Sequence, residues 1–217
     1  MSGRCGTSCE LPSRCDVAVI GAGPIGLMLA NLLGTAGVDV VLIERNIGLV
    51  GQPRAIAYDA ETLRLFAQVG LFDAIAPGLI QDPEVLYFNA RRRRLMHMKP
   101  PKTVFGHSPL GTFYQPHFER VLLDGLSRFA CVGASFAHKV TALAQDRDGV
   151  DVRIETPHGQ RVLRAKFVVG CDGGGSTTRE AIGARLIGST YAERWLVIDA
   201  LIRDLSLIHI SEPTRPY

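Results

Sequence analysis

The chain has 217 residues, of which 47% are hydrophobic and 21% are charged, and its formal net charge is +3 at pH 7. This length is enough for one domain with a buried core, and the composition is that of an ordinary globular protein. So small a net charge argues against nucleic acid as a partner. No apolar stretch approaches the ~20 residues that a membrane-spanning helix needs, which argues against a membrane protein.

The first 14 residues are small and polar, without the apolar centre of a secretory signal, and we expect a disordered leader. The chain holds five cysteines, an odd number. Cys5, Cys9 and Cys15 lie close together, but no histidine or further cysteine pair stands near them to complete a zinc site. Cys131 and Cys171 have the setting of buried apolar residues. We therefore expect reduced thiols, no metal site and a cytoplasmic protein.

The stretch 16–44 has the pattern of one nucleotide-binding unit. A short apolar run over 17–20 predicts a strand, and after a glycine-rich turn the run over 27–33 predicts a helix. A second buried strand over 38–43 ends on Glu44. Strand, helix, second strand and terminal acid together predict a dinucleotide site.

Each glycine of the turn has its own expected role. Gly21 would allow a tight turn, Gly23 the close approach of a pyrophosphate, and Gly26 the close packing of helix on strand. Phosphate would bind the free N–H groups and the positive end of the new helix. Glu44 follows 18 residues after the last glycine and is placed to accept hydrogen bonds from ribose hydroxyls.

The next segment is expected to be a loop over 45–57 followed by a helix that Asp59 caps and Gly70 ends. A short second helix is expected over 71–75. The apolar positions of the first helix that suit a core face are Leu63, Phe66, Ala67 and Val69.

An antiparallel hairpin is predicted over 84–98, as the start of a substrate-side sheet. The run Arg91–Arg94 is best interpreted as its solvated turn, since a nucleic-acid patch would need more basic residues around it. Residues 99–112 are expected to be a loop. Gln115 then opens a helix that runs over 117–129 and returns the chain to the nucleotide domain.

Alternating patterns over 139–144 and 150–155, with a third strand over 161–164, predict a β-meander that covers the dinucleotide sheet. A separate buried strand over 167–169 then runs into a segment of glycines around Asp172. Because ligands of open α/β sheets bind at the carboxyl edge of the strands, this segment predicts a second contact with the cofactor.

An alternative role for Asp172 is the N-cap of a helix over 177–182, and the two roles are compatible.

Together these motifs resemble the FAD-dependent aromatic hydroxylases of the para-hydroxybenzoate hydroxylase type, and within them the 3-(3-hydroxyphenyl)propionate hydroxylase branch. The resemblance implies an α/β fold: a Rossmann-like FAD-binding domain with a β-meander and the start of an inserted substrate-side sheet. The stretches that match, in family order, are 16–44, 53–56, 115–116 with the helix that follows, 170–179 and 195–199. Cofactor contacts are implied for Gly21, Gly23, Gly26, Glu44, Arg45, Arg54, Gln115, Asp172 and Gly173.

Among these, Gln115 is expected to donate an amide hydrogen bond to the flavin. The resemblance also implies FAD as the cofactor, NADH or NADPH as the co-substrate, and O₂ and a small phenolic or other aromatic acid as the substrates. No side chain stands out as catalytic, because neither a nucleophile with its base nor a metal-ligand spacing is present, and the difficult chemistry is assigned to the cofactor.

Two alternatives stay open: a related flavin monooxygenase that acts on a polyketide or quinone precursor, and a nucleotide-binding fragment without activity. An NAD-dependent dehydrogenase would leave the segment 170–179 unexplained. The sequence leaves open whether the protein is a homo-oligomer.

Residues 205–215 resemble, codon for codon, the translation of a transposase-type sequencing-library adapter. The Gly-Asp pair that the family uses as a third flavin contact is absent from the chain. We therefore expect an incomplete and inactive fragment. The expected divisions are a leader over 1–14, an FAD-binding domain over 15–82 and 113–182, a partial substrate domain over 83–112 and 183–204, and a non-native tail over 205–217.

Overall fold

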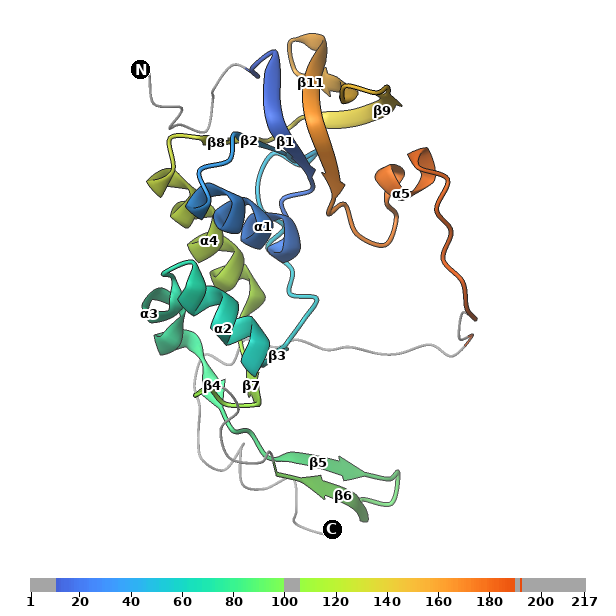
Figure 1. Ribbon diagram of the computed structural model, residues 1–217. Coiled ribbons are helices and arrows are strands. Elements are labelled where there is room, and N and C mark those ends of the chain that lie inside the picture. Colours follow the sequence, from blue (N-terminus) through green and yellow to red (C-terminus); the bar gives the residue numbers. More distant parts are fainter. Residues whose placement is uncertain (1–10, 100–105, 190–191, 193–217) are drawn as a thin grey trace. The chain divides into compact units, whose positions relative to one another are not determined.

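The computed structural model describes residues 11–99, 106–189 and 192 of the chain (Figure 1). The chain divides into a compact unit that ends at Arg185 and a second unit, described only at residues 186–189 and 192. The stretch 195–199 that matches the family and the expected non-native tail lie outside the described residues, so both stay predictions. The proposed domain boundaries likewise stay predictions.

The helices and strands are β1 (Arg14–Ile20), α1 (Pro24–Thr35), β2 (Val40–Ile43), β3 (Ala57–Asp59), α2 (Ala60–Gln68), α3 (Phe72–Ile75), η1 (Ala76–Gly78), β4 (Ile80–Gln81), β5 (Val85–Phe88), β6 (Arg94–Met98), β7 (Leu110–Thr112), α4 (Gln115–Gly125), η2 (Leu126–Arg128), β8 (Val132–Ser135), β9 (Lys139–Gln145), β10 (Val150–Thr156), β11 (Gly159–Gly170) and α5 (Thr177–Ala181). None of the helices in the described part of the chain has the length and apolarity that crossing a bilayer requires.

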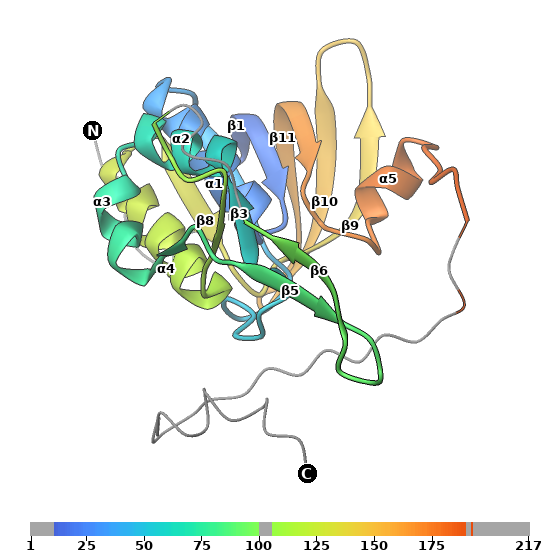
Figure 2. The same cartoon turned by 90° about the horizontal axis from the view of Figure 1, so that it is seen from below.

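A six-stranded sheet in the order β8-β2-β1-β11-β10-β9 is the frame of the first unit (Figure 2). The strands β8, β2, β1 and β11 run parallel, and β10 pairs antiparallel with both β11 and β9. From the central β1 the chain passes through α1 to β2 on one side, whereas β11 pairs on the other side. Ligands of open α/β sheets bind at such a change of strand order.

β11 unites two segments that the sequence predicts as separate strands. The ranges 161–164 and 167–169 both lie in it, because its first part pairs with β10 while the part from Arg164 onward pairs with β1. Because Arg164 and Lys166 are charged, they interrupt the apolar pattern, and the sequence does not show that the strand is continuous. Lys166 forms an ion pair with Asp16 of β1 (2.6 Å) and Arg164 pairs with two aspartates, so neither charge interrupts the strand. The prediction of two strands was wrong.

The two faces of this sheet are covered by different elements. Val17 and Val19 face a cluster built from α1, α2 and α4, and Ala18 and Ile20 face a cluster built with the meander, to which Ile154 belongs. This alternation is the two-residue period of a strand that is buried on both faces. The meander therefore covers the sheet, as predicted, and also continues it through β11.

Most of the helices lie where the sequence predicts them. Asp59 caps α2 by accepting a hydrogen bond from the N–H of Thr62 (2.8 Å), and Gly70 after the helix has φ of 69°. Ala67 is exposed, so its place on the predicted core face was wrong. The helix predicted over 117–129 begins at Gln115, and its last turn is the 3₁₀ helix η2.

The hairpin predicted over 84–98 is formed by β5 and β6. Four other short strands were not predicted: β3, β7 and β4 form a second sheet, and β8 forms an edge of the first. Residues 99–112 were expected to be a loop, but β7 occupies 110–112. These strands are two to four residues long, too short for an alternating pattern to be recognised.

A buried amide joins three helical segments. Asn31 of α1 is fully buried, and its Nδ2 donates to the carbonyl oxygens of Leu27 and Leu122, each at 2.9 Å. Its Oδ1 accepts from Nη2 of Arg128 (3.0 Å), which through Nη1 also donates to the carbonyl oxygen of Val69 (2.7 Å). α1, α4 with η2, and the end of α2 are thus held by one network.

We expect Asn31→Leu to lower the free energy of unfolding by about 2 kcal/mol or more, because the buried carbonyl of Leu122 and a guanidinium N–H lose their partners. Urea unfolding followed by circular dichroism measures this. Gln68→Leu, which replaces an exposed amide at the end of α2, is the control and should change stability little. Equal midpoints for both variants would show that the network does not stabilise the fold.

Candidate functional site

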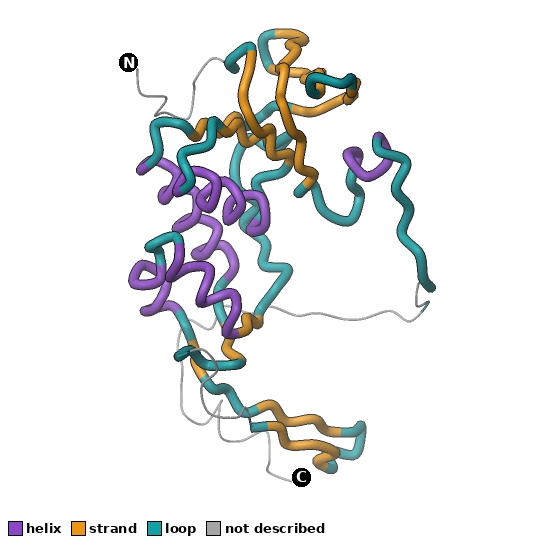
Figure 3. The backbone as a smooth tube through the Cα atoms, viewed as in Figure 1, coloured by secondary structure: helices purple, strands orange, loops and turns teal. Residues whose placement is uncertain are grey.

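The parallel strands β1, β2, β11 and β8 end at one edge of the sheet, and the loops after β1 and β11 leave it side by side (Figure 3). A cleft of about 410 Å³ opens there. Eight of the nine residues predicted to contact a cofactor line it: Gly21, Gly23, Glu44, Arg45, Arg54, Gln115, Asp172 and Gly173. The ninth, Gly26, is buried behind the loop.

Two glycines of the loop are required by the backbone itself. Gly21 has φ of 105°, its N–H donates to the carbonyl oxygen of Ile43 (2.8 Å), and a methyl group on it would lie 2.4 Å from the carbonyl oxygen of Cys171. A methyl group on Gly26 would lie 1.9 Å from the carbonyl oxygen of Gly21. Larger residues at either position would force the loop apart.

Gly23 differs, because no atom lies within 4 Å of the place where its Cβ would stand. It is the N-cap of α1, Pro24 follows it, and the helix has neither a side-chain cap nor an acid in its first turn. The first N–H groups of this 12-residue helix, and the positive end of its dipole, are therefore left for a ligand. An open space beside them fits a phosphate group.

Glu44 already has partners in the protein. Its Oε2 accepts a hydrogen bond from the N–H of Ala22 (2.8 Å), and its Oε1 accepts from the backbone and the side-chain amide of Asn46 (2.9 and 2.6 Å). A carboxylate has about four acceptor positions, so a ribose hydroxyl still finds one. Glu44 therefore also connects the glycine loop to the end of β2 by a hydrogen bond. No pattern in the sequence predicts this contact.

Asp172 lies in the loop after β11 and lines the same cleft. Its carboxylate accepts hydrogen bonds from the hydroxyl of Ser176, from that of Thr177 and from both the N–H and the hydroxyl of Thr178. Burial raises the pKa of Asp172, but these hydrogen bonds outweigh it, and the pKa lies below its ordinary value. Asp172 is thus a fixed negative charge at the cleft.

The cap of α5 is Ser176, whose Oγ accepts from the N–H of Arg179 (2.9 Å). Asp172 accepts one backbone N–H of the helix, that of Thr178, but the N-cap position belongs to Ser176, so the predicted alternative role of Asp172 as the N-cap itself was wrong. The cap lies one residue before the helix, where a serine is as good an acceptor as an aspartate.

Gln115 is almost fully buried, with 2% of its surface exposed. Its Oε1 accepts hydrogen bonds from the N–H groups of Arg54 (2.7 Å) and Ala55 (2.8 Å), and its Nε2 donates to Oε1 of Glu119 (2.7 Å). The amide is thus bonded to the protein, and the expected hydrogen bond to a flavin stays a prediction for its second N–H. Glu119 also lines the cleft and was missed, although its position four residues after Gln115 on one helix was a signal.

Basic side chains border the cleft, namely Arg45, Arg54 and Lys139. Within the described ranges, no acidic side chain lies at ion-pair distance from any of the three. These cations are therefore available to a polyphosphate, which carries the charge that the start of α1 also favours.

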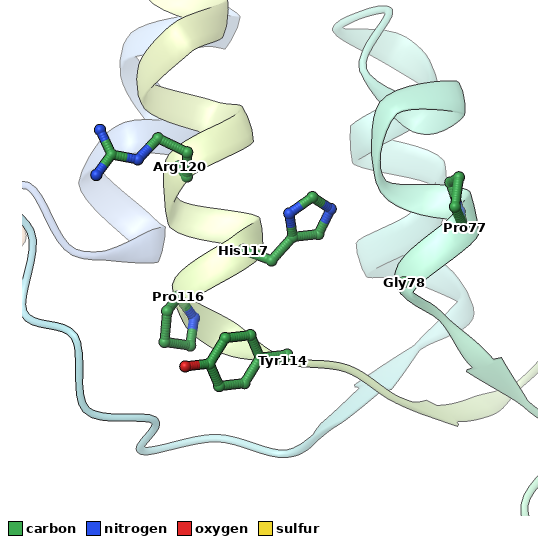
Figure 4. Close-up of a pocket in the computed structure, with 6 residues that line it drawn as sticks. All are labelled: Pro77, Gly78, Tyr114, Pro116, His117 and Arg120. Carbon is green, nitrogen blue, oxygen red and sulfur yellow. The ribbon is translucent and has the colours of Figure 1, made fainter. Parts of the chain in front are cut away.

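A second hollow lies between η1 and the start of α4 (Figure 4). It is open and mostly apolar, and none of the predicted site residues lines it. It lacks the glycine-rich turn and the open helix start that form the phosphate-binding end of the first cleft. The residues that line it are Pro77, Gly78, Tyr114, Pro116, His117 and Arg120.

Comparison with known proteins shows which family the chain resembles. The sequence profile of a family described as "FAD binding domain" matches residues 14–215. The curated 3-(3-hydroxy-phenyl)propionate/3-hydroxycinnamic acid hydroxylase of Mycolicibacterium smegmatis is 40% identical over 209 residues. That alignment covers 95% of this chain but 37% of the relative, so the chain spans little more than a third of that relative's length.

Solved structures of aromatic hydroxylases also match the chain. A p-nitrophenol 4-monooxygenase from Pseudomonas putida matches with a TM-score of 0.77 and 32% identity over 83% of this chain and 47% of its own. A ternary complex of aklavinone-11 hydroxylase with FAD and aklavinone matches with a TM-score of 0.67 and 26% identity, over 78% of this chain and 35% of its own.

Two glycine variants separate the cleft from the loop that builds it. Gly23→Ala should weaken FAD binding at least about tenfold because its methyl group occupies the open space, while stability falls by no more than about 1 kcal/mol. Gly26→Ala should instead prevent the loop from forming. Fluorescence titration with FAD measures the first effect, and thermal unfolding measures the second. Wild-type affinity of the Gly23→Ala protein would show that the phosphate binds elsewhere.

Glu44→Ala should weaken FAD binding by about ten- to a hundredfold, since a hydrogen bond to a charged group contributes about 1.5–3 kcal/mol. The fold should survive, because Asn46 is exposed and its N–H groups can bond to water instead, and Ala22 lines the cleft. The same titration measures the affinity. An unchanged dissociation constant would show that Glu44 serves only the loop.

Proposed function

The chain belongs to the FAD-binding domain family, and from this we propose that its complete protein is an FAD-dependent monooxygenase that hydroxylates a phenolic or other aromatic acid. A 40% identical relative carries the name of a 3-(3-hydroxyphenyl)propionate hydroxylase, so that acid is the substrate we propose first. The observation that carries the proposal is the cleft where the loops after β1 and β11 meet, because it joins a phosphate site to an ionised Asp172.

The residues of the cleft fit FAD when they are considered group by group. Gly23 and the start of α1 would bind the pyrophosphate, and Glu44 would accept from the adenosine ribose. Arg45 and Arg54 would balance the phosphate charge. Gln115, Asp172 and Gly173 would line the part of the cleft toward the flavin.

Bound FAD would supply the redox chemistry, in which NADH or NADPH provides two electrons and O₂ is split between product and water. Written in full, NAD(P)H, one proton, O₂ and an aromatic C–H give NAD(P)⁺, an aromatic C–OH and H₂O. In this scheme the chain's own residues hold and orient the cofactor. Asp172, kept ionised by its three neighbours, holds the loop after β11 in one conformation beside the glycine turn.

A related activity on a larger ring system is the second candidate, because aklavinone-11 hydroxylase shares the fold at 26% identity. The substrate screen below distinguishes the two. We further propose a cytoplasmic location, since Cys131 and Cys171 are free thiols and such thiols persist in a reducing compartment.

The complete protein should be yellow as purified and release FAD on denaturation. Addition of 3-(3-hydroxyphenyl)propionate should accelerate NADH or NADPH oxidation and give one hydroxylated product per reduced nicotinamide, as measured by absorbance at the nicotinamide band and by mass spectrometry. Turnover of polycyclic phenols alone would favour the second candidate. A colourless protein that binds NADH tightly would contradict the proposal.

The 217-residue chain by itself should hydroxylate nothing and bind FAD weakly at best. Its hairpin β5–β6 leaves large apolar side chains exposed, among them Phe88 (53%) and Leu95 (66%), which favours aggregation. The test is expression of these residues alone, with FAD added, and an assay for phenol-dependent NADH oxidation. Stoichiometric hydroxylated product would show that the chain is sufficient for the activity.

A further inference from the structure

We propose that Glu119 is a positioning residue of the cofactor cleft, which through Gln115 fixes the backbone of Arg54 and Ala55 and thereby the place from which the Arg54 guanidinium reaches the cofactor. The inference rests on the proposed function for the identity of the cofactor. The latch itself (Glu119, Gln115 and the two N–H groups) is read directly from the structure.

The latch connects two parts of the cleft that are far apart in the sequence. Gln115 and Glu119 are four residues apart on one face of α4, and both are buried with 2% of their surface exposed. The Gln115 amide lies between them and the loop: its Nε2 donates to Glu119 Oε1 (2.7 Å), and its Oε1 accepts from Arg54 and Ala55. α4 thus holds a loop that lies 60 residues earlier in the chain.

The loop has little else to hold it. The ends of the loop are anchored, because the carbonyl oxygen of Asn46 accepts from the N–H of Ala137 (2.8 Å) and that of Ile56 accepts from the N–H of Phe113 (3.0 Å). For the described backbone groups of residues 47–55, the hydrogen bonds that the structure gives are the two to Gln115. Leu49 packs against the main core, but it lies five residues before Arg54. Arg54 and Ala55 themselves are exposed. The position of Arg54 along the cleft therefore depends on the Gln115 amide.

Glu119 and the two backbone N–H groups together select which way that amide faces. If the amide were turned over, its NH₂ would face the two backbone N–H groups and its oxygen would face the Glu119 carboxylate, so donors would meet donors and acceptors would meet acceptors. With Glu119 as acceptor, only the observed orientation satisfies all groups. Hydrogen bonds in a chain also polarise one another, so the carboxylate makes Gln115 Oε1 a stronger acceptor for the loop.

A structural acid alone would not be expected at this place. Among the residues that the structure describes, no cation lies at ion-pair distance from Glu119, and its carboxylate lines the cleft. Burying a carboxyl group with so few partners costs free energy that a leucine on the same helix face would not. A role in the cleft accounts for an acid at this buried position.

The first measurement is hydrogen exchange of the loop in the FAD-free complete protein. Glu119→Leu should increase the exchange rate of the Arg54 and Ala55 amides about tenfold, the loss that about 1.4 kcal/mol produces. Glu119→Gln keeps an acceptor and should restore most of the protection. Asp124→Leu, which replaces an exposed acid on the same helix, is the matched control and should leave the loop unchanged.

Gln115→Met provides a second route to the same state, because it removes the acceptor itself while nearly keeping the side-chain volume. It should increase exchange at Arg54 and Ala55 as Glu119→Leu does. Wild-type exchange at both amides in either folded variant would overturn the latch.

The second measurement is a double-mutant cycle on FAD affinity. Glu119→Leu and Arg54→Ala should each weaken binding about tenfold, and together they should weaken it little more than Arg54→Ala alone, because Glu119 acts through Arg54. Fully additive effects would overturn the positioning role. A wild-type protein that shows the protected loop but binds no FAD would contradict the proposed function and leave the latch in place.

Discussion

The contact on which the rest of the site depends is the one between the turn after β1 and the turn after β11. Gly21 lies at φ of 105° with the Cys171 carbonyl where a side chain would otherwise be, and Gly26 closes on Gly21 from the helix side. Because these backbones touch, the start of α1 and the carboxylate of Asp172 reach the same cleft. The parallel pairing of β1 with β11 fixes this approach, since it brings Ile20 opposite Gly170.

Several side chains of the cleft serve the framework and the expected ligand together. Glu44 ties the glycine loop to β2, Asp172 gathers the hydroxyls at the start of α5, and Gln115 holds the loop around Arg54. A site built in this way is organised before a ligand arrives, which lowers the ordering cost of binding. It also means that a lost carboxylate changes the cleft as well as the contact, so affinity and loop order have to be measured separately.

The sequence predicted what long periodic segments encode, namely the first strand–helix–strand unit, the hairpin and the meander, together with the residues that meet in the cleft. It missed features that only tertiary contacts define. The strand β11 was divided because Arg164 and Lys166 break its apolar run, and β3, β4, β7 and β8 are too short to show a period. Glu119 was missed because its spacing of four residues from Gln115 also occurs on solvated helix faces, so the spacing alone does not distinguish a buried acid from an exposed one.

The central claim is that FAD binds where the loops after β1 and β11 meet, and hydrogen exchange of the complete protein with and without FAD tests it most directly. Saturating FAD should slow exchange in peptides that cover residues 21–26, 44–46 and 171–175. In the first turns of α4, the amides that change should be those of Gln115 and Glu119, which line the cleft. Protection confined to the hollow beside Pro77 and His117, with no change in the glycine loop, would contradict the account.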